Sequence, residues 1–146
     1  MDDVKNDMTI DVLSLPVEAG DIAAIGSLNA EAFGRELESV ERFIEFLSQK
    51  NMFLVVARDW AGEIVGKGTL YIRILDDGRR VGWVDNVAVI KRYQKTGVGS
   101  LLDEKICKIA RKERCLEVCL SSKEAGGFYE KIGYRRYETN VYRKIL

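Results

Sequence analysis

Six consecutive residues, Gln94 to Gly99, are of the types best suited to hold a phosphate-bearing molecule. They follow an apolar run at positions 81–90 and open an amphipathic run at positions 97–112. Where a helix begins, several backbone N–H groups lack intrahelical partners, and the helix dipole adds partial positive charge. Gly97 and Gly99 have no side chains to keep a bulky anion away from these donors. The segment therefore predicts a pyrophosphate site.

Charge is distributed unevenly around this segment. The whole chain has 23 basic and 23 acidic residues, and its zero formal net charge argues against a dedicated nucleic-acid binder. Residues 91–114 nevertheless hold eight basic and three acidic side chains, and Lys91, Arg92 and Lys95 among them would favour an anion. Residues 1–50 hold eleven acidic and four basic ones. That acidic surface either lies near a cationic acceptor or is simply solvated.

Two polar residues interrupt the apolar run before the loop. Asp85 and Asn86 are adjacent, and neighbours in a regular strand face opposite sides of the sheet. One of them would therefore enter the core, where an unpaired carboxylate is costly. We expect a β-bulge or a parting of two strands at this point.

Composition excludes several classes of site. The chain has no histidine, so it can form neither a Ser-His-Asp triad nor a histidine-ligated zinc site, and no metal is expected. It has three cysteines, an odd number, at positions 107, 115 and 119. Reduced, packed thiols in the cytoplasm explain them better than a disulfide framework does.

Length and periodicity predict one α/β domain spanning residues 1–146. No apolar run is long enough to cross a bilayer, and the N-terminus lacks the pattern of a secretory signal, so no membrane association is expected. The predicted element order is βααβββαβαβ. The predicted strands are 8–15, 52–57, 63–75, 81–90, 116–120 and 134–145, and the predicted helices are 18–33, one capped by Ser39, 97–112 and 125–132.

Two segments together resemble the GNAT superfamily of acyl-CoA-dependent N-acetyltransferases. The first is Gln-Lys-Thr-Gly-Val-Gly at 94–99, which matches the family's Arg/Gln-x-x-Gly-x-Gly/Ala pyrophosphate loop. The second is Gly-Phe-Tyr-Glu-Lys-Ile-Gly-Tyr at 127–134, similar to the Phe-Tyr-x-Lys-x-Gly-Phe/Tyr stretch of many members. A Walker loop would need a Gly-Lys-Ser/Thr sequence, and a dinucleotide fingerprint would need a glycine in place of Leu102. The resemblance implies a mixed, mostly antiparallel central sheet flanked by helices.

The same resemblance implies acetyl-CoA as co-substrate and an amine as acceptor. Backbone N–H groups of the loop would hold the pyrophosphate, and the strand before it would pair with the pantetheine arm as if with an added strand. Ser122 could instead cap the short helix, and Lys131 could instead be solvated. The implied cofactor-binding residues are Val87, Ala88, Val89, Gln94, Lys95, Thr96, Gly97, Val98, Gly99, Ser100, Ser122, Phe128 and Lys131.

Tyr129 and Asp85 are the catalytic candidates. Tyr129 matches the family tyrosine that protonates the departing CoA thiolate, and a phenol suits that task. Asp85 interrupts an apolar strand beside the expected acetyl position and would take the proton of an ammonium acceptor, with Glu124 as second choice. A backbone N–H near Val87 would polarise the acetyl carbonyl.

The sequence leaves the acceptor open. Residues 82–87 and 128–131 are somewhat similar to glucosamine-6-phosphate N-acetyltransferases, whose pattern places Glu-Asp at 85–86 and Asp and Asn at Leu120 and Ala125. An aminoglycoside-like compound, an amino acid, another small amine or a protein N-terminus are the alternatives. A non-catalytic CoA-binding regulatory module is an alternative of another class. The resemblance also implies a homodimer.

Overall fold

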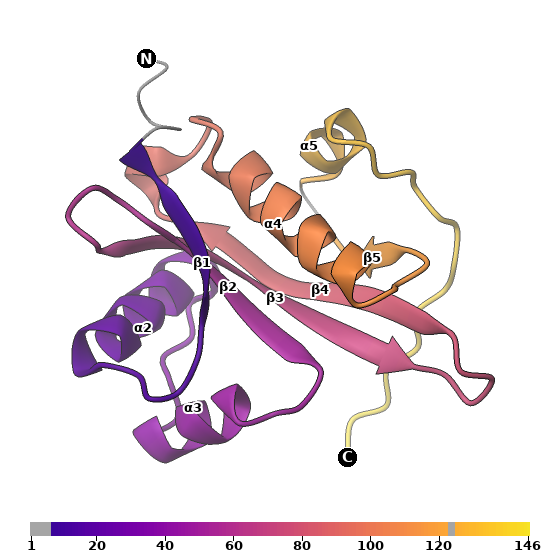
Figure 1. Ribbon diagram of the computed structural model, residues 1–146, viewed down its shortest axis with the longest axis horizontal. Coiled ribbons are helices and arrows are strands. Elements are labelled where there is room, and N and C mark those ends of the chain that lie inside the picture. The colour runs from indigo at the N-terminus through magenta and orange to yellow at the C-terminus, as the bar shows by residue number, and fades with distance from the viewer. Residues whose placement is uncertain (1–6, 123–124) are drawn as a thin grey trace.

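The computed structural model describes residues 7–122 and 125–146 and has a central sheet with helices on both faces (Figure 1). The α/β class and the mostly antiparallel sheet are confirmed. Each predicted boundary up to residue 132 lies within two residues of the observed one. The elements are β1 (Thr9–Leu13), α2 (Ala19–Phe33), α3 (Val40–Leu47), β2 (Met52–Arg58), β3 (Ile64–Ile74), β4 (Arg80–Val89), η1 (Lys91–Tyr93), α4 (Val98–Lys112), β5 (Val118–Leu120) and α5 (Gly126–Lys131).

The sheet follows the order of the chain, β1-β2-β3-β4-β5. Strands β1 to β4 are antiparallel neighbours, whereas β4 and β5 are parallel and are joined through α4. The parallel pairing is short, because only Gly82–Val84 of β4 has partners in Val118–Leu120 of β5. The two strands therefore share a hydrogen-bonded edge over a small part of the length of β4.

Apolar side chains alternate along the strands and form a core on each face of the sheet. On one face, Val98, Leu102 and Ile106 of α4 are fully buried against the sheet. On the other face, Ile25 and Leu28 of α2 are buried against the sheet, where α2 contacts β3 and β4. Burying one such side chain contributes about 1.5–3 kcal/mol. The two cores together hold the middle of the sheet, and β4 with it, in place.

Two glycines of β3 allow α4 to lie close to the sheet. A Cβ on Gly66 would lie 3.2 Å from Val98 Cγ1, and one on Gly68 would lie 3.1 Å from Ile106 Cδ1. Both distances are shorter than ordinary van der Waals contact. The close approach fixes the first turn of α4 relative to β3.

A partly buried ion pair joins α2 to β2. Arg58 donates to both carboxylate oxygens of Asp21, at 2.8 and 2.9 Å. The pair lowers the pKa of Asp21 and raises that of Arg58. Some of the acidic side chains in residues 1–50 are thus internal partners, not a surface offered to a cationic acceptor.

The last predicted strand, at residues 134–145, is wrong. Residues 134–146 form neither strand nor helix and run along one side of the molecule (Figure 1). Tyr137, Val141 and Tyr142 are 86%, 83% and 88% exposed. Aromatic and β-branched residues favour a strand only where a neighbouring strand pairs with them, because β-propensity largely reflects packing on a sheet.

Candidate active site

The loop before α4 has the left-handed turn that an anion cradle requires. Lys95 and Gly97 have φ angles of 62° and 99°, and Gly97 is the N-cap of α4. Glycine adopts such a φ without strain. Because Gly97 has no side chain with which to cap the helix, the first N–H groups of α4 can meet an external anion.

Two polar side chains of the loop are used to brace it. The Gln94 side-chain amide donates to the Val89 carbonyl at 3.0 Å, and the Thr96 hydroxyl donates to the Tyr93 carbonyl. Since Val89 ends β4, the loop is fastened to the strand that leads into it. The side chains of Gln94 and Thr96 are bound to backbone carbonyls of the protein, which leaves their backbone as the part that could face a phosphate.

The cations around the loop differ in their surroundings. Lys91 and Lys95 are exposed. The Arg92 guanidinium lies 3.9 Å from the Asp59 carboxylate and 4.0 Å from that of Glu63, both at the turn between β2 and β3. Arg92 therefore shares its charge with this acidic turn, and Lys91 and Lys95 supply the positive charge nearest the loop in sequence.

The two sequence motifs meet at the first turn of α4. A Cβ on Gly99 would lie 3.1 Å from Cζ of Phe128 on α5, so the phenyl ring rests directly against this glycine. A residue with a side chain would displace the ring. Segments about thirty residues apart in the chain are thus joined at one contact, which places Tyr129 relative to the loop.

A row of aromatic rings extends from this contact. The Tyr129 ring meets Phe128 and Tyr134 edge to face, with centroids 5.1 and 5.5 Å apart. The Tyr134 hydroxyl donates to Asp103 Oδ1 of α4 at 2.6 Å. Burial raises the pKa of Tyr129, and the nearby Asp103 charge raises it further. Tyr129 therefore holds its proton at neutral pH.

The expected irregularity at Asp85 and Asn86 is confirmed as a β-bulge. Lys67 pairs with Ala88 and Thr69 pairs with Asp85, so two residues of β4 oppose the single residue Gly68 of β3. Asn86 has a φ of 53°, in the left-handed region. The extra residue bends β4 locally and interrupts the ladder.

Beyond the bulge, β4 has an open edge on the side of β5. The Ile90 N–H donates to the Val65 carbonyl of β3 at 2.9 Å. Because the backbone groups of successive strand residues point alternately to the two sides, those of Val87 and Val89 point away from β3. In the part of the sheet that the structure describes, β5 pairs with β4 only as far as Val84. The Val87 backbone groups and the Val89 N–H can thus pair with an extended molecule as an added strand, while the Val89 carbonyl is bound by Gln94.

Asp85 lies on the face of the sheet that carries α2 and α3. Its Oδ1 accepts a hydrogen bond from the Trp83 ring nitrogen at 3.0 Å, which orients the carboxylate. Thr69 of β3 pairs with Asp85, and two residues further along the strands Tyr71 pairs with Trp83. At about 3.3 Å per residue, the two pairs are about 7 Å apart. The carboxylate therefore lies between the bulge and this aromatic pair.

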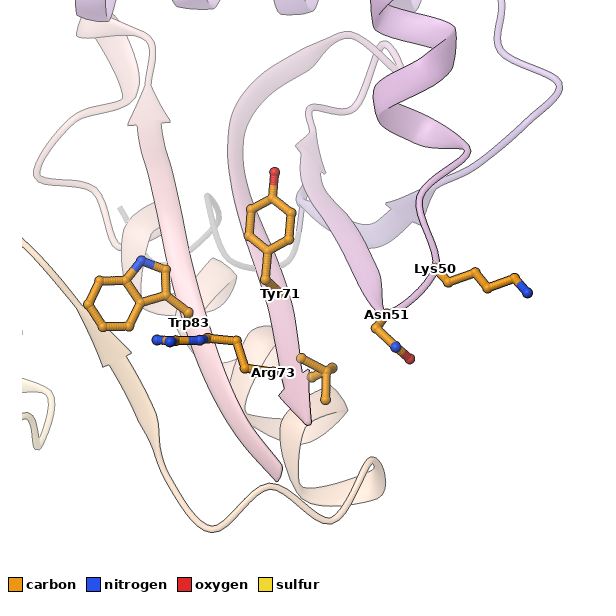
Figure 2. A pocket seen from close by; sticks show the side chains of 6 residues that line it. Lys50, Asn51, Tyr71, Arg73 and Trp83 are labelled. Carbon is orange, nitrogen blue, oxygen red and sulfur yellow. The ribbon is translucent and has the colours of Figure 1, made fainter. Parts of the chain in front are cut away.

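The aromatic pair borders a cavity of about 450 Å³ (Figure 2). Arg73 lies beside Trp83, its guanidinium carbon 5.9 Å from the ring centroid, and Lys50 points away from both. Aromatic faces and a guanidinium suit a polar molecule that carries a negative charge. The lining residues are Lys50, Asn51, Tyr71, Ile72, Arg73 and Trp83.

Sequence reasoning missed Lys67, which is buried beside the bulge. It is 4% exposed, and its ammonium group donates to the Asn86 carbonyl at 3.1 Å and lies 5.3 Å from the Phe33 ring centroid. Burial lowers its pKa to about 8. The sequence did hold a sign of this burial, because Lys67 lies between two glycines inside an apolar strand, where its side chain is hard to keep exposed to solvent.

The remaining site candidates are Ser122, Lys131 and Glu124. Ser122 accepts from the Ala125 N–H at 3.0 Å and so caps the turn leading into α5, which is the alternative considered for it. Lys131 is exposed, as a solvated lysine would be. Glu124, the second candidate base, falls outside the described residues.

The three cysteines are free. Burial raises the pKa of the Cys107, Cys115 and Cys119 thiols, and the Asp103 carboxylate raises that of Cys107 further. Over the described ranges, His, Cys, Asp and Glu side chains form no group of three that could hold a metal ion. No helix within these ranges is both long and apolar enough to span a membrane.

A glycine-opened helix, a bulged strand with an open edge, and an aromatic helix packed on that glycine together form this site. The GNAT acetyltransferase domain family matches residues 49–136, which include all three features. The chain belongs to the GNAT acetyltransferase family. Acetyl-CoA is the co-substrate of this family.

Comparisons with individual GNAT proteins agree with this assignment. The glucosamine 6-phosphate N-acetyltransferase of Trypanosoma brucei brucei is 39% identical over 83 residues, 55% of this chain and 56% of that protein. The enzyme of the same name from Candida albicans is 32% identical over 78 residues, 51% and 52% of the two chains. This chain thus matches about half the length of these curated relatives.

Solved GNAT structures share the whole fold. A Trypanosoma brucei acetyltransferase superposes with a TM-score of 0.81 at 27% identity, covering 95% of this chain and all of that one. An aminoglycoside acetyltransferase from an uncultured soil sample gives a TM-score of 0.81 at 19% identity, covering 97% of each chain, a likeness of fold alone.

Proposed function

We propose that this GNAT chain is an enzyme that transfers the acetyl group of acetyl-CoA to a primary amine by direct attack in a ternary complex. The observation that carries the proposal is the contact between Gly99 and Phe128. It joins an open helix N-terminus to a helix bearing a protonated tyrosine. A stable core could form without these three features lying near one another: a glycine, an uncapped helix start and an open strand edge. Their proximity therefore supports a binding site.

The residues present fit the proposed co-substrate. The N–H groups at the start of α4 suit a pyrophosphate, and the edge of β4 at Val87–Val89 suits an extended arm with amide groups. When bound, acetyl-CoA supplies the thioester carbonyl that the amine attacks. The Val87 N–H would polarise that carbonyl oxygen.

Two side chains would move protons in the reaction. Asp85 would accept the proton that an ammonium acceptor must lose before its nitrogen can attack, directly or through water. Tyr129 would donate its phenolic proton to the CoA sulfur as the carbon–sulfur bond breaks. The raised pKa of Tyr129 supports this role, because it keeps the phenol protonated beforehand.

The direct test is an acceptor screen with acetyl-CoA in which the released thiol is measured. Acetylation of at least one amine is the expected result. A protein-only control is needed because the chain has three free thiols. Tight CoA binding without transfer to any amine would favour a regulatory module. Competition by ordinary nucleotides equal to that by CoA would favour a phosphate-binding domain unrelated to CoA.

An amino-sugar phosphate is the favoured acceptor, on a specific observation. Arg73 beside Trp83 supplies a cation at the cavity, and its partner in β4, Val81, is four residues from Asp85. The names of the two curated relatives agree with such a substrate. Asp85-Asn86, Leu120 and Ala125 differ from the pattern of those enzymes, so a changed arrangement of acceptor contacts is part of the proposal.

Arg73→Gln is expected to raise the KM for glucosamine 6-phosphate about tenfold, because a charge-assisted hydrogen bond contributes about 1.5–3 kcal/mol. The KM for glucosamine should change much less, since it has no phosphate. Steady-state kinetics with both acceptors measures the difference. Arg79→Gln, at the exposed turn after β3, is the matched control. Equal changes in the KM values of both acceptors would show that Arg73 does not recognise the phosphate.

Gly99→Val is expected to weaken CoA binding about tenfold or more, for which 1.4 kcal/mol of lost binding free energy suffices. The added side chain would push Phe128 aside and stand before the N–H groups of α4. Calorimetric titration with CoA measures the effect. Gly20→Ala in α2, where a Cβ meets nothing within 4 Å, should bind like the wild type. Unchanged affinity in Gly99→Val would place the pyrophosphate elsewhere.

The proposed enzyme is a cytoplasmic homodimer. Apolar and aromatic side chains exposed along residues 137–145 support self-association, because exposed apolar patches commonly mark interfaces. Light scattering after size exclusion gives the mass in solution. A monomer at micromolar concentration would contradict the dimer without affecting the proposed reaction.

A further inference from the structure

We propose that Lys67 is a positioning residue that sets the direction of the peptide between Asn86 and Val87. Through this peptide it would hold the Val87 N–H in place for the acyl carbonyl. The inference rests on the proposed function, because it assigns to Lys67 the support of a donor that acetyl transfer would use.

The first argument is the placement of a charge where packing does not need one. Lys67 is 4% exposed, and among the described side chains no carboxylate forms an ion pair with it. Burying an ammonium group without a counter-ion destabilises a fold, so an apolar side chain of similar length would fit this core better. A costly group that persists at a strand bulge indicates a role other than stability.

The second argument is the direction of the hydrogen bond. The ammonium group of Lys67 donates to the Asn86 carbonyl at 3.1 Å and lies on the face of the sheet that carries α2. In a planar trans peptide the carbonyl and the following N–H point in opposite directions. The alternation set by the Ile90 bond to β3 directs the Val87 N–H to the open edge of β4, and the carbonyl at the other end of its peptide is the one that Lys67 binds. That is the edge on which the pantetheine arm is proposed to lie.

The third argument is that the bulge has lost its ordinary restraint. Gly68 of β3 faces both Asn86 and Val87, so the regular one-to-one pairing is broken here. Asn86 also has a left-handed φ of 53°, which asparagine adopts more readily than other residues with side chains. The bond from Lys67 restrains the carbonyl of this residue, which the broken pairing leaves without its regular partner. A cationic donor on the carbonyl also polarises the peptide, which makes its N–H a stronger donor.

The kinetic test compares Lys67→Met, Lys67→Arg and the wild type. Lys67→Met should lower kcat about tenfold, less than the 10²–10³ typical for complete loss of an oxyanion donor. The Kd for CoA should change less than about threefold, since the donors at α4 are untouched. Lys67→Arg keeps a cationic donor and should recover part of kcat. Lys108→Met, exposed on α4, is the control expected to match the wild type.

A second readout needs neither co-substrate nor activity. In the apo protein, the ¹⁵N chemical shift of the Val87 amide should differ between wild type and Lys67→Met by more than that of Val89. Lys67→Arg should lie nearer the wild type. Thermal unfolding establishes that each variant is folded, and Lys67→Gln takes the place of any that is not.

Three results separate the possibilities. Wild-type protein that acetylates no amine would overturn the proposed function and this inference with it. An active wild type with unchanged kcat and unchanged Val87 shift in Lys67→Met would overturn the inference alone. A loss of kcat matched by an equal loss of CoA binding would make Lys67 a structural support of the sheet, which also overturns it.

Discussion

Tyr129→Phe is expected to lower kcat about 100-fold or more while changing the Kd for acetyl-CoA less than about threefold. The change removes one phenolic O–H and leaves the ring, so the edge-to-face contacts with Phe128 and Tyr134 persist. The contact between Phe128 and Gly99 at the start of α4 therefore stays intact. What is lost is the proton for the departing sulfur. Steady-state kinetics and calorimetry on the same preparation separate turnover from binding.

Tyr134→Phe is the matched control. It removes the hydrogen bond to Asp103 but leaves the phenol of Tyr129, so it should affect stability more than turnover. Because the pKa of Tyr129 is raised above its ordinary value of 10, loss of this acid should reduce kcat only above pH 10. Wild-type turnover in Tyr129→Phe would mean that water or another group protonates the thiolate.

Lys67→Met is expected to be more stable than the wild type at pH 7, because keeping a buried lysine of pKa about 8 charged costs about 3 kcal/mol and the lost hydrogen bond to Asn86 offsets only about 1 kcal/mol of this. The folded-state pKa of Lys67 is about 8, against 10.5 for a free lysine. Between these values the unfolded chain binds more protons than the folded one, so wild-type stability rises with pH. The loss of wild-type stability caused by the charge on Lys67 is complete below pH 8 and disappears by about pH 10.5. The advantage of the methionine variant should therefore shrink across this window.

Urea unfolding of both proteins at pH 7, 8, 9 and 10 measures this advantage. The raised pKa values of Tyr134 and the cysteines act in the opposite direction, and they are common to both proteins, so they cancel in the difference. Lys108→Met should show no such trend. An advantage that stays constant with pH would show that Lys67 titrates like an exposed lysine. Together with the kinetic test, the expected result is a variant that gains stability and loses rate.

Local patterns in the sequence were sufficient for most of the fold. The loop at 94–99 and the helix after it were predictable because glycine positions and helical periodicity are local properties. The bulge was predictable for a related reason, since adjacent Asp85 and Asn86 conflict with the alternation of a strand. The strand at 134–145 failed because strand formation depends on a partner elsewhere in the chain.

The site was less predictable where long-range contacts decide a role. Lys67 is separated by nineteen residues from the carbonyl that it binds, so its local sequence could indicate that it is buried but not which group it binds. Gln94 and Thr96 match the loop pattern, yet their side chains bind the backbone of the preceding residues. The contact of Phe128 with Gly99 follows from no spacing rule, although both motifs were recognisable separately.

The raised pKa values of the three cysteines bear on the proposed reaction, in which CoA would be released as a free thiol. A thiolate, not a thiol, attacks other sulfur atoms. Cys107, Cys115 and Cys119 stay protonated at neutral pH, so they should form mixed disulfides with oxidised CoA only slowly. Partial burial of its three sulfur atoms would thus protect the proposed enzyme from forming disulfides with CoA.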